Sequence, residues 1–185
     1  MLHLGGDSRT LSHRHSEILL LLATHPEGLT TEQLAVELHA DDLPLVTVRA
    51  EMSRLRGLLG DLAPTSRPYR LPHPLATDLA QVEQHVRRGQ TARAVRLYRG
   101  PVLPHSDAPG VLRVRRRLHD QVRAAVLGSG DPMLLMAWGE SPAGADDAEV
   151  WAAAARALPP GSPQHALARL RLAALDEEFG VPGQR

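Results

Sequence analysis

The stretch Leu29–Gly60, LTTEQLAVELHADDLPLVTVRAEMSRLRGLLG, decides the predicted fold of this chain. It predicts a short helix, a turn and a longer helix. Thr30 followed by Gln33 is a capping-box pattern, which marks the start of the first helix. Asp41, Asp42 and Pro44 then interrupt the helical pattern, because these residues favour turns. The second helix is predicted over residues 45–59.

The predicted helix at 45–59 has two different faces. Apolar residues recur at spacings of four, three and four and form a core stripe: Val48, Met52, Leu55 and Leu59. The opposite face is small in its middle and basic at its edges, and it includes Val46, Thr47, Arg49, Ala50, Ser53 and Arg54. Small side chains permit close approach to DNA, and arginines reach base edges or phosphates. This profile is typical of a helix that enters the major groove.

Residues 62–71 follow this helix and predict a short hairpin, with Arg67 near its tip and Arg70 on its returning strand. Pro64 and Pro68 keep such a hairpin short and confine it to an edge, because proline cannot donate a ladder hydrogen bond. Two helices followed by a hairpin have the order of a winged helix-turn-helix. The hairpin is the expected wing.

Two further elements precede this unit. Residues 2–11 predict a small hairpin, because Gly5-Gly6-Asp7-Ser8 separates two alternating segments. Residues 13–24 predict a helix that is apolar on every side and therefore buried. The first domain is expected over residues 1–74, and the fold class is mainly α with a small β component.

Everything after Pro72 has helical patterns. Residues 78–88 and a helix starting at Thr91 are joined by Gly89-Gln90, which predicts a helical hairpin of the kind found in tetratricopeptide repeats. A long helix follows from Pro109, and shorter ones are predicted near 132–138, 147–158 and 163–179. No strict repeat period is present. We expect an irregular, all-helical, tetratricopeptide-like domain over residues 76–180.

The composition excludes several classes of protein. The chain has 185 residues, no cysteine and a net charge of zero, so it has neither disulfides nor thiolate metal ligands. The longest apolar run, Ile18 to Ala23, is too short to cross a membrane, and the N-terminus lacks the apolar region of a signal peptide. We expect a cytoplasmic protein that does not contact a membrane. The charge is unevenly spread, since residues 76–130 carry ten arginines against four acidic residues.

No pattern indicates catalysis, a cofactor or a metal site. The ten histidines are scattered, and His13 and His15 point away from each other on a helix. Neither a nucleophile motif nor a glycine-rich phosphate loop occurs. The sequence therefore predicts a protein that is not an enzyme.

Two groups of residues in the helical part have alternative interpretations. Arg113, Arg116 and Arg117 share one side of the long helix. They form either a charged outer face paired with the acidic C-terminal part or a contact for phosphate or a protein partner. Trp138 and Trp151 are either core anchors, which we expect, or part of a binding site.

Two parts of the sequence resemble known bacterial regulators. The helices TTEQLAVEL and VTVRAEMSRLRGLLG, with Tyr69-Arg70-Leu71, resemble the winged helix-turn-helix of OmpR/PhoB-type response regulators and SARP-type activators. The segment ARAVRLYRGPVLP (92–104) and the arginine-rich helix after it resemble the bacterial transcriptional activator domain. This order is similar to the C-terminal region of regulators with an upstream GAF sensor domain. The resemblance covers roughly residues 1–130.

The resemblance implies binding of double-stranded DNA and contact with RNA polymerase. It places Thr47, Ala50, Ser53 and Arg54 on positions that face bases or phosphates, Arg56 on one that faces the backbone, and Arg67 on the wing. Pro68 stands where the family has a wing glycine. An upstream sensor domain and a second protomer are further expected partners. The alternative is a protein-interaction adaptor, in which the winged helix and the helical array dock proteins.

Overall fold

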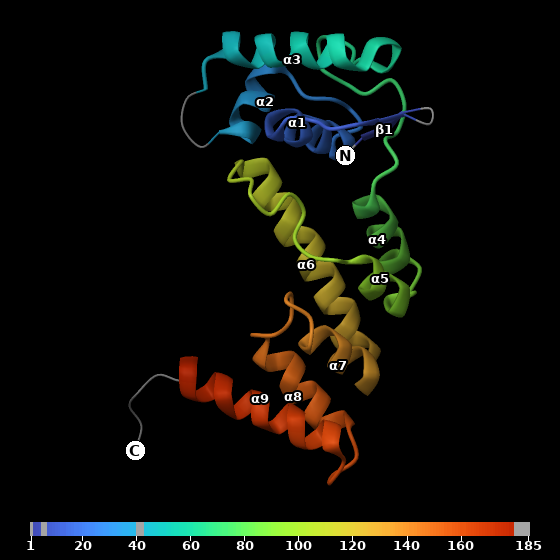
Figure 1. Cartoon of the computed structure of the whole chain (residues 1–185), viewed down its shortest axis with the longest axis vertical. Coiled ribbons are helices and arrows are strands. Elements are labelled where there is room, and N and C mark those ends of the chain that lie inside the picture. The colour runs from blue at the N-terminus through green and yellow to red at the C-terminus, as the bar shows by residue number, and fades with distance from the viewer. Residues whose placement is uncertain (1, 5–6, 40–42, 180–185) are drawn as a thin grey trace. The chain divides into compact units, whose positions relative to one another are not determined.

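The computed structural model describes residues 2–4, 7–39 and 43–179, and most of these residues are helical (Figure 1). The mainly α fold class is confirmed. The strands and α-helices are, in chain order, β1 (Leu2–Leu4), β2 (Asp7–Arg9), α1 (His13–Thr24), α2 (Thr31–Leu38), α3 (Leu45–Leu59), α4 (Asp78–Arg87), α5 (Thr91–Leu97), α6 (Pro109–Ser129), α7 (Pro132–Gly139), α8 (Ala148–Ala157) and α9 (Pro163–Phe179). A 3-10 turn, Gly60–Leu62, follows α3.

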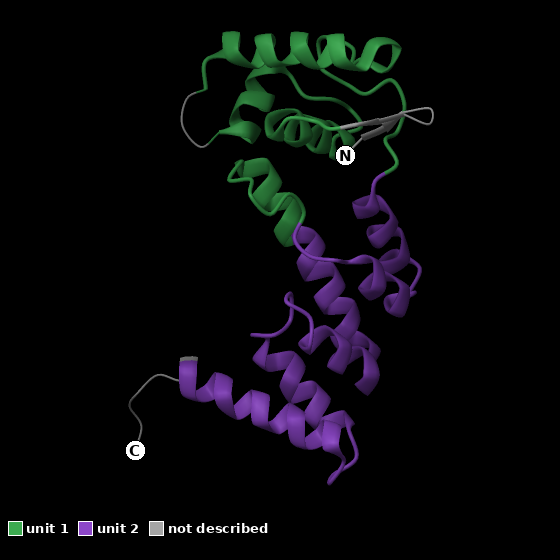
Figure 2. Cartoon of the chain, in the orientation of Figure 1, with its two compact units in different colours: residues 1–76, 102–116 green, residues 77–101, 117–185 purple. Residues whose placement is uncertain are grey.

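The chain forms two compact units (Figure 2). Unit 1 contains residues 1–76 and 102–116, and unit 2 contains residues 77–101 and 117–185. The sequence-based division at 1–74 and 76–180 stays a prediction about domains. The compact units differ from it in one respect, because residues 102–116, which include the start of α6, belong to unit 1.

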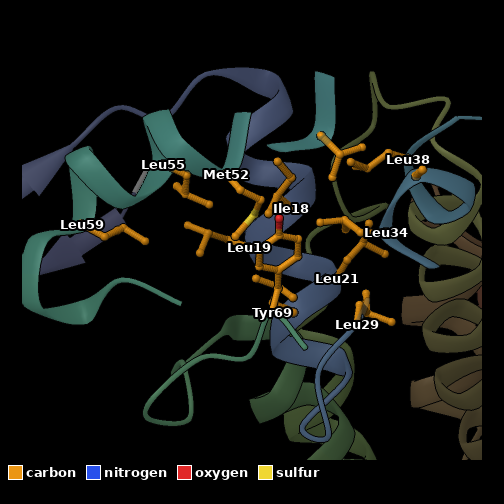
Figure 3. Close-up of a cluster of buried hydrophobic side chains, with 13 residues drawn as sticks. Ile18, Leu19, Leu21, Leu29, Leu34, Leu38, Met52, Leu55, Leu59 and Tyr69 are labelled. Carbon is orange, nitrogen blue, oxygen red and sulfur yellow. The ribbon is translucent and has the colours of Figure 1, made fainter. Parts of the chain in front are cut away.

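The core of unit 1 is built by α1, α2 and α3. Figure 3 shows Met52, Leu55 and Leu59 of α3 directed toward side chains of α1 and toward Tyr69. The predicted stripe of α3 is buried as expected, and α1 buries every residue from Ile18 to Leu22. The buried cluster is Ile18, Leu19, Leu21, Leu22, Leu29, Leu34, Ala35, Leu38, Val48, Met52, Leu55, Leu59 and Tyr69.

Local signals at the helix ends agree with the structure. The Thr30 side chain accepts from the backbone N–H of Gln33, and the Gln33 side chain accepts from the backbone N–H of Thr30, so the predicted capping box is present. Ser12 caps α1, since its hydroxyl accepts from the backbone N–H of His15. The predicted turn residues Asp41 and Asp42 lie outside the described residues.

The predicted wing at 62–71 differs from the structure. No strand occurs in this segment, which contains instead a loop closed by a 2.8 Å hydrogen bond from the Thr65 backbone N–H to the Arg70 carbonyl. Two prolines, Pro64 and Pro68, remove the donors that a regular ladder needs. The loop returns to the core through a single antiparallel bridge between Leu29 and Tyr69, with N–O distances of 3.0 and 2.8 Å.

The predicted N-terminal hairpin is confirmed as a two-stranded antiparallel pair. β1 and β2 are in the register Leu2↔Arg9, His3↔Ser8 and Leu4↔Asp7. Its turn residues, Gly5 and Gly6, are outside the described part of the chain. The second strand begins earlier than the sequence pattern suggested.

Residues 102–116 pack onto α1 and α2 within unit 1. Gly110 of α6 is buried, and a Cβ built there would lie 2.5 Å from Leu21 Cδ2 and 3.1 Å from the Glu37 carbonyl oxygen. Only a residue without a side chain permits this approach. The Arg115 guanidinium donates to the carbonyls of Val102, Leu103 and Ser106 and so holds the loop before α6.

Unit 2 is entirely helical in the part of it that is described. α4 packs with α5, α5 with α7, and α7, α8 and α9 pack in succession. Trp138 and Trp151 are each 1% exposed, which confirms them as core anchors.

Arg123 of α6 donates to both Asp147 oxygens and to Glu149, at 2.6 to 2.9 Å, and these hydrogen bonds raise the pKa of its guanidinium. No described helix is long and apolar enough to cross a membrane.

Candidate nucleic-acid interface

The outer face of α3 is open to solvent along its length. Val46 is 69% exposed, and Thr47, Arg49, Ser53 and Arg54 are also exposed, whereas Ala50 is half-buried. The two faces of α3 therefore divide as the sequence predicted. The exposed face combines short side chains with two arginines, and such a surface can approach a groove closely.

Arg54 is held by an acidic neighbour one turn earlier on α3. Its Nη1 lies 2.5 Å from Glu51 Oε1, and the other carboxylate oxygen of Glu51 lies 3.2 Å from Nε2 of His15 on α1. Glu51 thus connects α1 to the exposed face of α3. Because only one nitrogen of Arg54 contacts the carboxylate, its remaining donors are free to contact a base edge.

Arg49 lies at the other edge of the same face and forms no ion pair within the described residues. The positive charge of Arg49 does affect the carboxyl group of Glu32 on α2 at longer range. The pKa of the Glu32 carboxyl is lowered, first by a backbone hydrogen bond, then by one from the Thr30 hydroxyl, and least by the charge of Arg49. Arg49 consequently remains available to an external anion.

Arg56 has a different environment from the one expected for a DNA-backbone contact. Its Nε donates to the Pro64 carbonyl at 3.0 Å, its Nη2 donates to the Ser66 hydroxyl, and the guanidinium lies 5.6 Å from the centre of the Tyr69 ring. These contacts attach the loop to α3. Arg56 therefore orients this loop in the structure, while its DNA contact stays a prediction.

The loop itself presents Arg67 and Arg70 to solvent. Arg67 has a φ of 62°, a conformation that places it at the turn of the loop, close to the predicted tip. Gly28 makes the close approach of this loop possible, since its φ is 86° and a Cβ there would lie 2.8 Å from the Tyr69 carbonyl oxygen.

The three predicted contact arginines of α6 have separate environments. Arg113 pairs with Glu37 at 2.6 Å in unit 1, and Arg117 pairs with Glu83 at 3.0 Å in unit 2. Arg116 is exposed without an ion pair in the described chain. The acids that pair with Arg113 and Arg117 come from α2 and α4, not from the C-terminal part. Two of the three residues are thus salt-bridged, but the predicted pairing with the acidic C-terminal part is wrong for both.

A buried polar cluster in unit 1 was not anticipated from the sequence. Glu17 is 3% exposed and lies 2.8 Å from Arg14, 3.1 Å from His13 and 2.5 Å from the hydroxyl of Ser106, which is also buried. His13 and Arg14 precede Glu17 by four and three residues, and this spacing indicates ion pairs along one side of a helix. Nothing in the sequence indicates the contact with Ser106, 89 residues away.

No group of three or more potential metal-ligating side chains is found in residues 2–4, 7–39 and 43–179. Two histidines of unit 1, His13 and His15, instead contact carboxylates.

Comparison with known proteins adds two similarities. Residues 131–181, which include α7–α9, match the family described as "YTH3-like protein, third C-terminal helical domain". The chain is 45% identical over 177 residues to the "Uncharacterized 47.3 kDa protein in thcA 5'region" of Rhodococcus erythropolis. The match includes 96% of this chain and 40% of that protein, so the chain spans less than half of its relative's length. No solved structure matches significantly.

Proposed function

We propose that this chain is a sequence-specific DNA-binding transcription regulator in which α3 enters the major groove. The observation that carries the proposal is the exposed face of α3, where Val46, Thr47, Ala50 and Ser53 are short and Arg49 and Arg54 flank them. Short side chains allow close approach, and arginine makes bidentate contacts with guanine.

The arrangement around α3 supports a winged helix-turn-helix in reduced form. Three helices pack around one core, and the segment before α2 pairs with the loop after α3 through Leu29 and Tyr69. In proteins of this class the second helix of the motif contacts bases while neighbouring segments contact the backbone. The loop with Arg67 and Arg70 takes the place of the wing.

Unit 2 is proposed to contact a protein partner, with RNA polymerase as the expected one. Its successive helix pairs support an all-helical domain, and we propose that this domain is an irregular, tetratricopeptide-like array. We propose that such a regulator acts in the cytoplasm and binds DNA tightly only together with an upstream sensor domain or a second protomer.

Substitution of Arg54 by alanine tests the proposal. A duplex selected by the wild-type chain from genomic fragments provides the binding site. We expect Arg54→Ala to weaken binding to this duplex by about 1–3 kcal/mol and to relax preference at one position. Arg171→Ala on α9, which removes another exposed arginine, is the control and should leave binding unchanged. An unaltered footprint and affinity in Arg54→Ala would contradict the assignment.

One observation favours the second candidate, a protein-interaction adaptor. Val36 on α2 and Val46 on α3 are 66% and 69% exposed, and exposed apolar side chains suit protein docking. The dependence of binding affinity on salt concentration distinguishes the two functions. Binding of DNA through several arginines weakens steeply as salt rises, whereas apolar docking does not.

A further inference from the structure

Four exposed arginines lie on or directly after the helical hairpin formed by α4 and α5 in unit 2. Arg88 lies at the turn, Arg93 and Arg96 lie one turn apart on α5, and Arg99 follows the end of α5. We call these four residues the hairpin arginines. The sequence contains no acidic residue between Glu83 and Asp107, so the charge of this segment is not balanced locally.

The hairpin arginines lack carboxylate partners within the described residues, whereas two arginines of α6 in unit 2 have such partners. Arg117 and Arg123 each pair with acids at 3.0 Å or less. None of the four hairpin arginines forms an ion pair within the described residues, and the one side-chain hydrogen bond among them there runs from Arg96 Nε to the Ala92 carbonyl. Glu83, the last acid before them, already contacts Arg87 and Arg117.

The positive charges of the hairpin arginines do not stabilise the packing of α4 against α5. The hairpin packs through apolar side chains, of which Leu79, Val82 and Ala94 are buried. Arg93 and Arg96 are like charges three residues apart on one helix, and such pairs are unfavourable. A segment that keeps four unpaired positive charges exposed is therefore suited to an anionic partner.

We infer that the hairpin arginines form a second DNA contact, which binds the phosphate backbone without recognising sequence. This inference rests on the proposed DNA-binding function. Phosphates are favoured over an acidic protein because a protein partner also needs apolar anchors. The exposed large hydrophobic side chains of the described chain are Val36, Val46, Leu62, Met133 and Leu170, and none lies in the hairpin. Phosphate binding needs only positive charge.

The test compares two triple variants of the full chain. Arg93→Gln, Arg96→Gln and Arg99→Gln together remove most of the cluster and keep side chains that favour helices. The matched control is Arg156→Gln, Arg169→Gln and Arg171→Gln, which removes from α8 and α9 three exposed arginines that form no ion pair with any described residue. Both variants change the net charge equally. Circular dichroism and urea unfolding verify that both remain folded.

Affinity is measured from about 50 to 200 mM salt, a range over which phosphate contacts strongly affect binding, for the selected duplex and for a random duplex. We expect the hairpin variant to lose affinity for both duplexes by the same factor. The slope of log K against log salt should decrease by about 2–3, since each lost phosphate contact contributes about 0.9. The control should retain the wild-type slope.

Equal slopes for the hairpin variant and the control would overturn the inference while leaving recognition by α3 intact. In the opposite case, the hairpin variant has a reduced slope, but the wild-type chain binds the selected and the random duplex equally well. This result would support the phosphate contact and contradict the sequence-specific function. If the hairpin variant loses only binding to polyglutamate and keeps its DNA slope, the partner is an acidic protein and the phosphate assignment is wrong.

Discussion

Arg54 and Arg56 are two residues apart on α3, yet their surroundings give them different roles. Arg54 extends from the exposed face beside Glu51, whereas Arg56 turns to the Pro64 carbonyl and the Tyr69 ring. A separation of two residues turns a side chain by about 200° around a helix. Position on the helix, more than residue type, therefore determines which arginine is exposed to solvent and which one contacts the loop.

The buried hydroxyl of Ser106 is expected to stabilise unit 1. This hydroxyl donates to Glu17 Oε1 and accepts from the Ala108 backbone N–H. We expect Ser106→Ala to lower the free energy of unfolding by about 1–3 kcal/mol, because the buried Glu17 carboxylate loses a donor that water cannot replace. Urea denaturation monitored by circular dichroism measures the change.

Ser53→Ala on the exposed face of α3 is the matched control for this substitution. It removes the same hydroxyl from a solvent-exposed site and should change the stability by less than about 0.5 kcal/mol. Equal effects of the two substitutions would mean that the contact between Glu17 and Ser106 does not stabilise unit 1.

At the scale of the element, α6 contains two glycines whose replacement by alanine should have opposite effects. At Gly110 a Cβ would clash with Leu21 and Glu37, so Gly110→Ala should destabilise the protein by about 1–3 kcal/mol. At Gly128 no atom lies within 4 Å of a built Cβ. Gly128→Ala should therefore stabilise α6 by up to about 1 kcal/mol, because alanine favours helix. Thermal unfolding of the two variants measures both effects, and a shift of the same sign in both would contradict the packing at Gly110.

The helices were predictable from the sequence because their signals are local. The capping box at Thr30 and the four-three-four spacing in α3 depend only on nearby residues, and both are present.

The loop at 62–71 was not predictable in the same way. Its path depends on Arg56, on the bridge to Leu29 and on Gly28, and these contacts join segments that are separate in the sequence. The outer face of α3 was predictable, but the restraint of Arg54 by Glu51 was not, because either residue could have pointed to solvent.

At the scale of the whole molecule, unit 1 uses two separate segments of the chain, and this has a consequence for fragments. Residues 102–116 supply Ser106 to Glu17, Arg113 to Glu37 and the close contact of Gly110 with Leu21. A fragment ending at residue 76 loses all of these contacts and exposes a buried carboxylate and part of the core. The sequence pattern alone had favoured a self-contained first domain over residues 1–74.

We therefore expect fragment 1–76 to unfold at a lower urea concentration than fragment 1–129, which retains residues 102–116 and the whole of α6. Removing one partner from a buried polar cluster and uncovering apolar surface both lower stability, by several kcal/mol together. Hydrogen exchange at the Leu34 amide, in the core of α2, measures the loss locally in both fragments. A synthetic peptide of residues 102–129 added to fragment 1–76 should restore protection if the missing contacts are the cause. If both fragments protect Leu34 equally, α1–α3 fold without residues 102–116, and the contact at Gly110 is dispensable for unit 1.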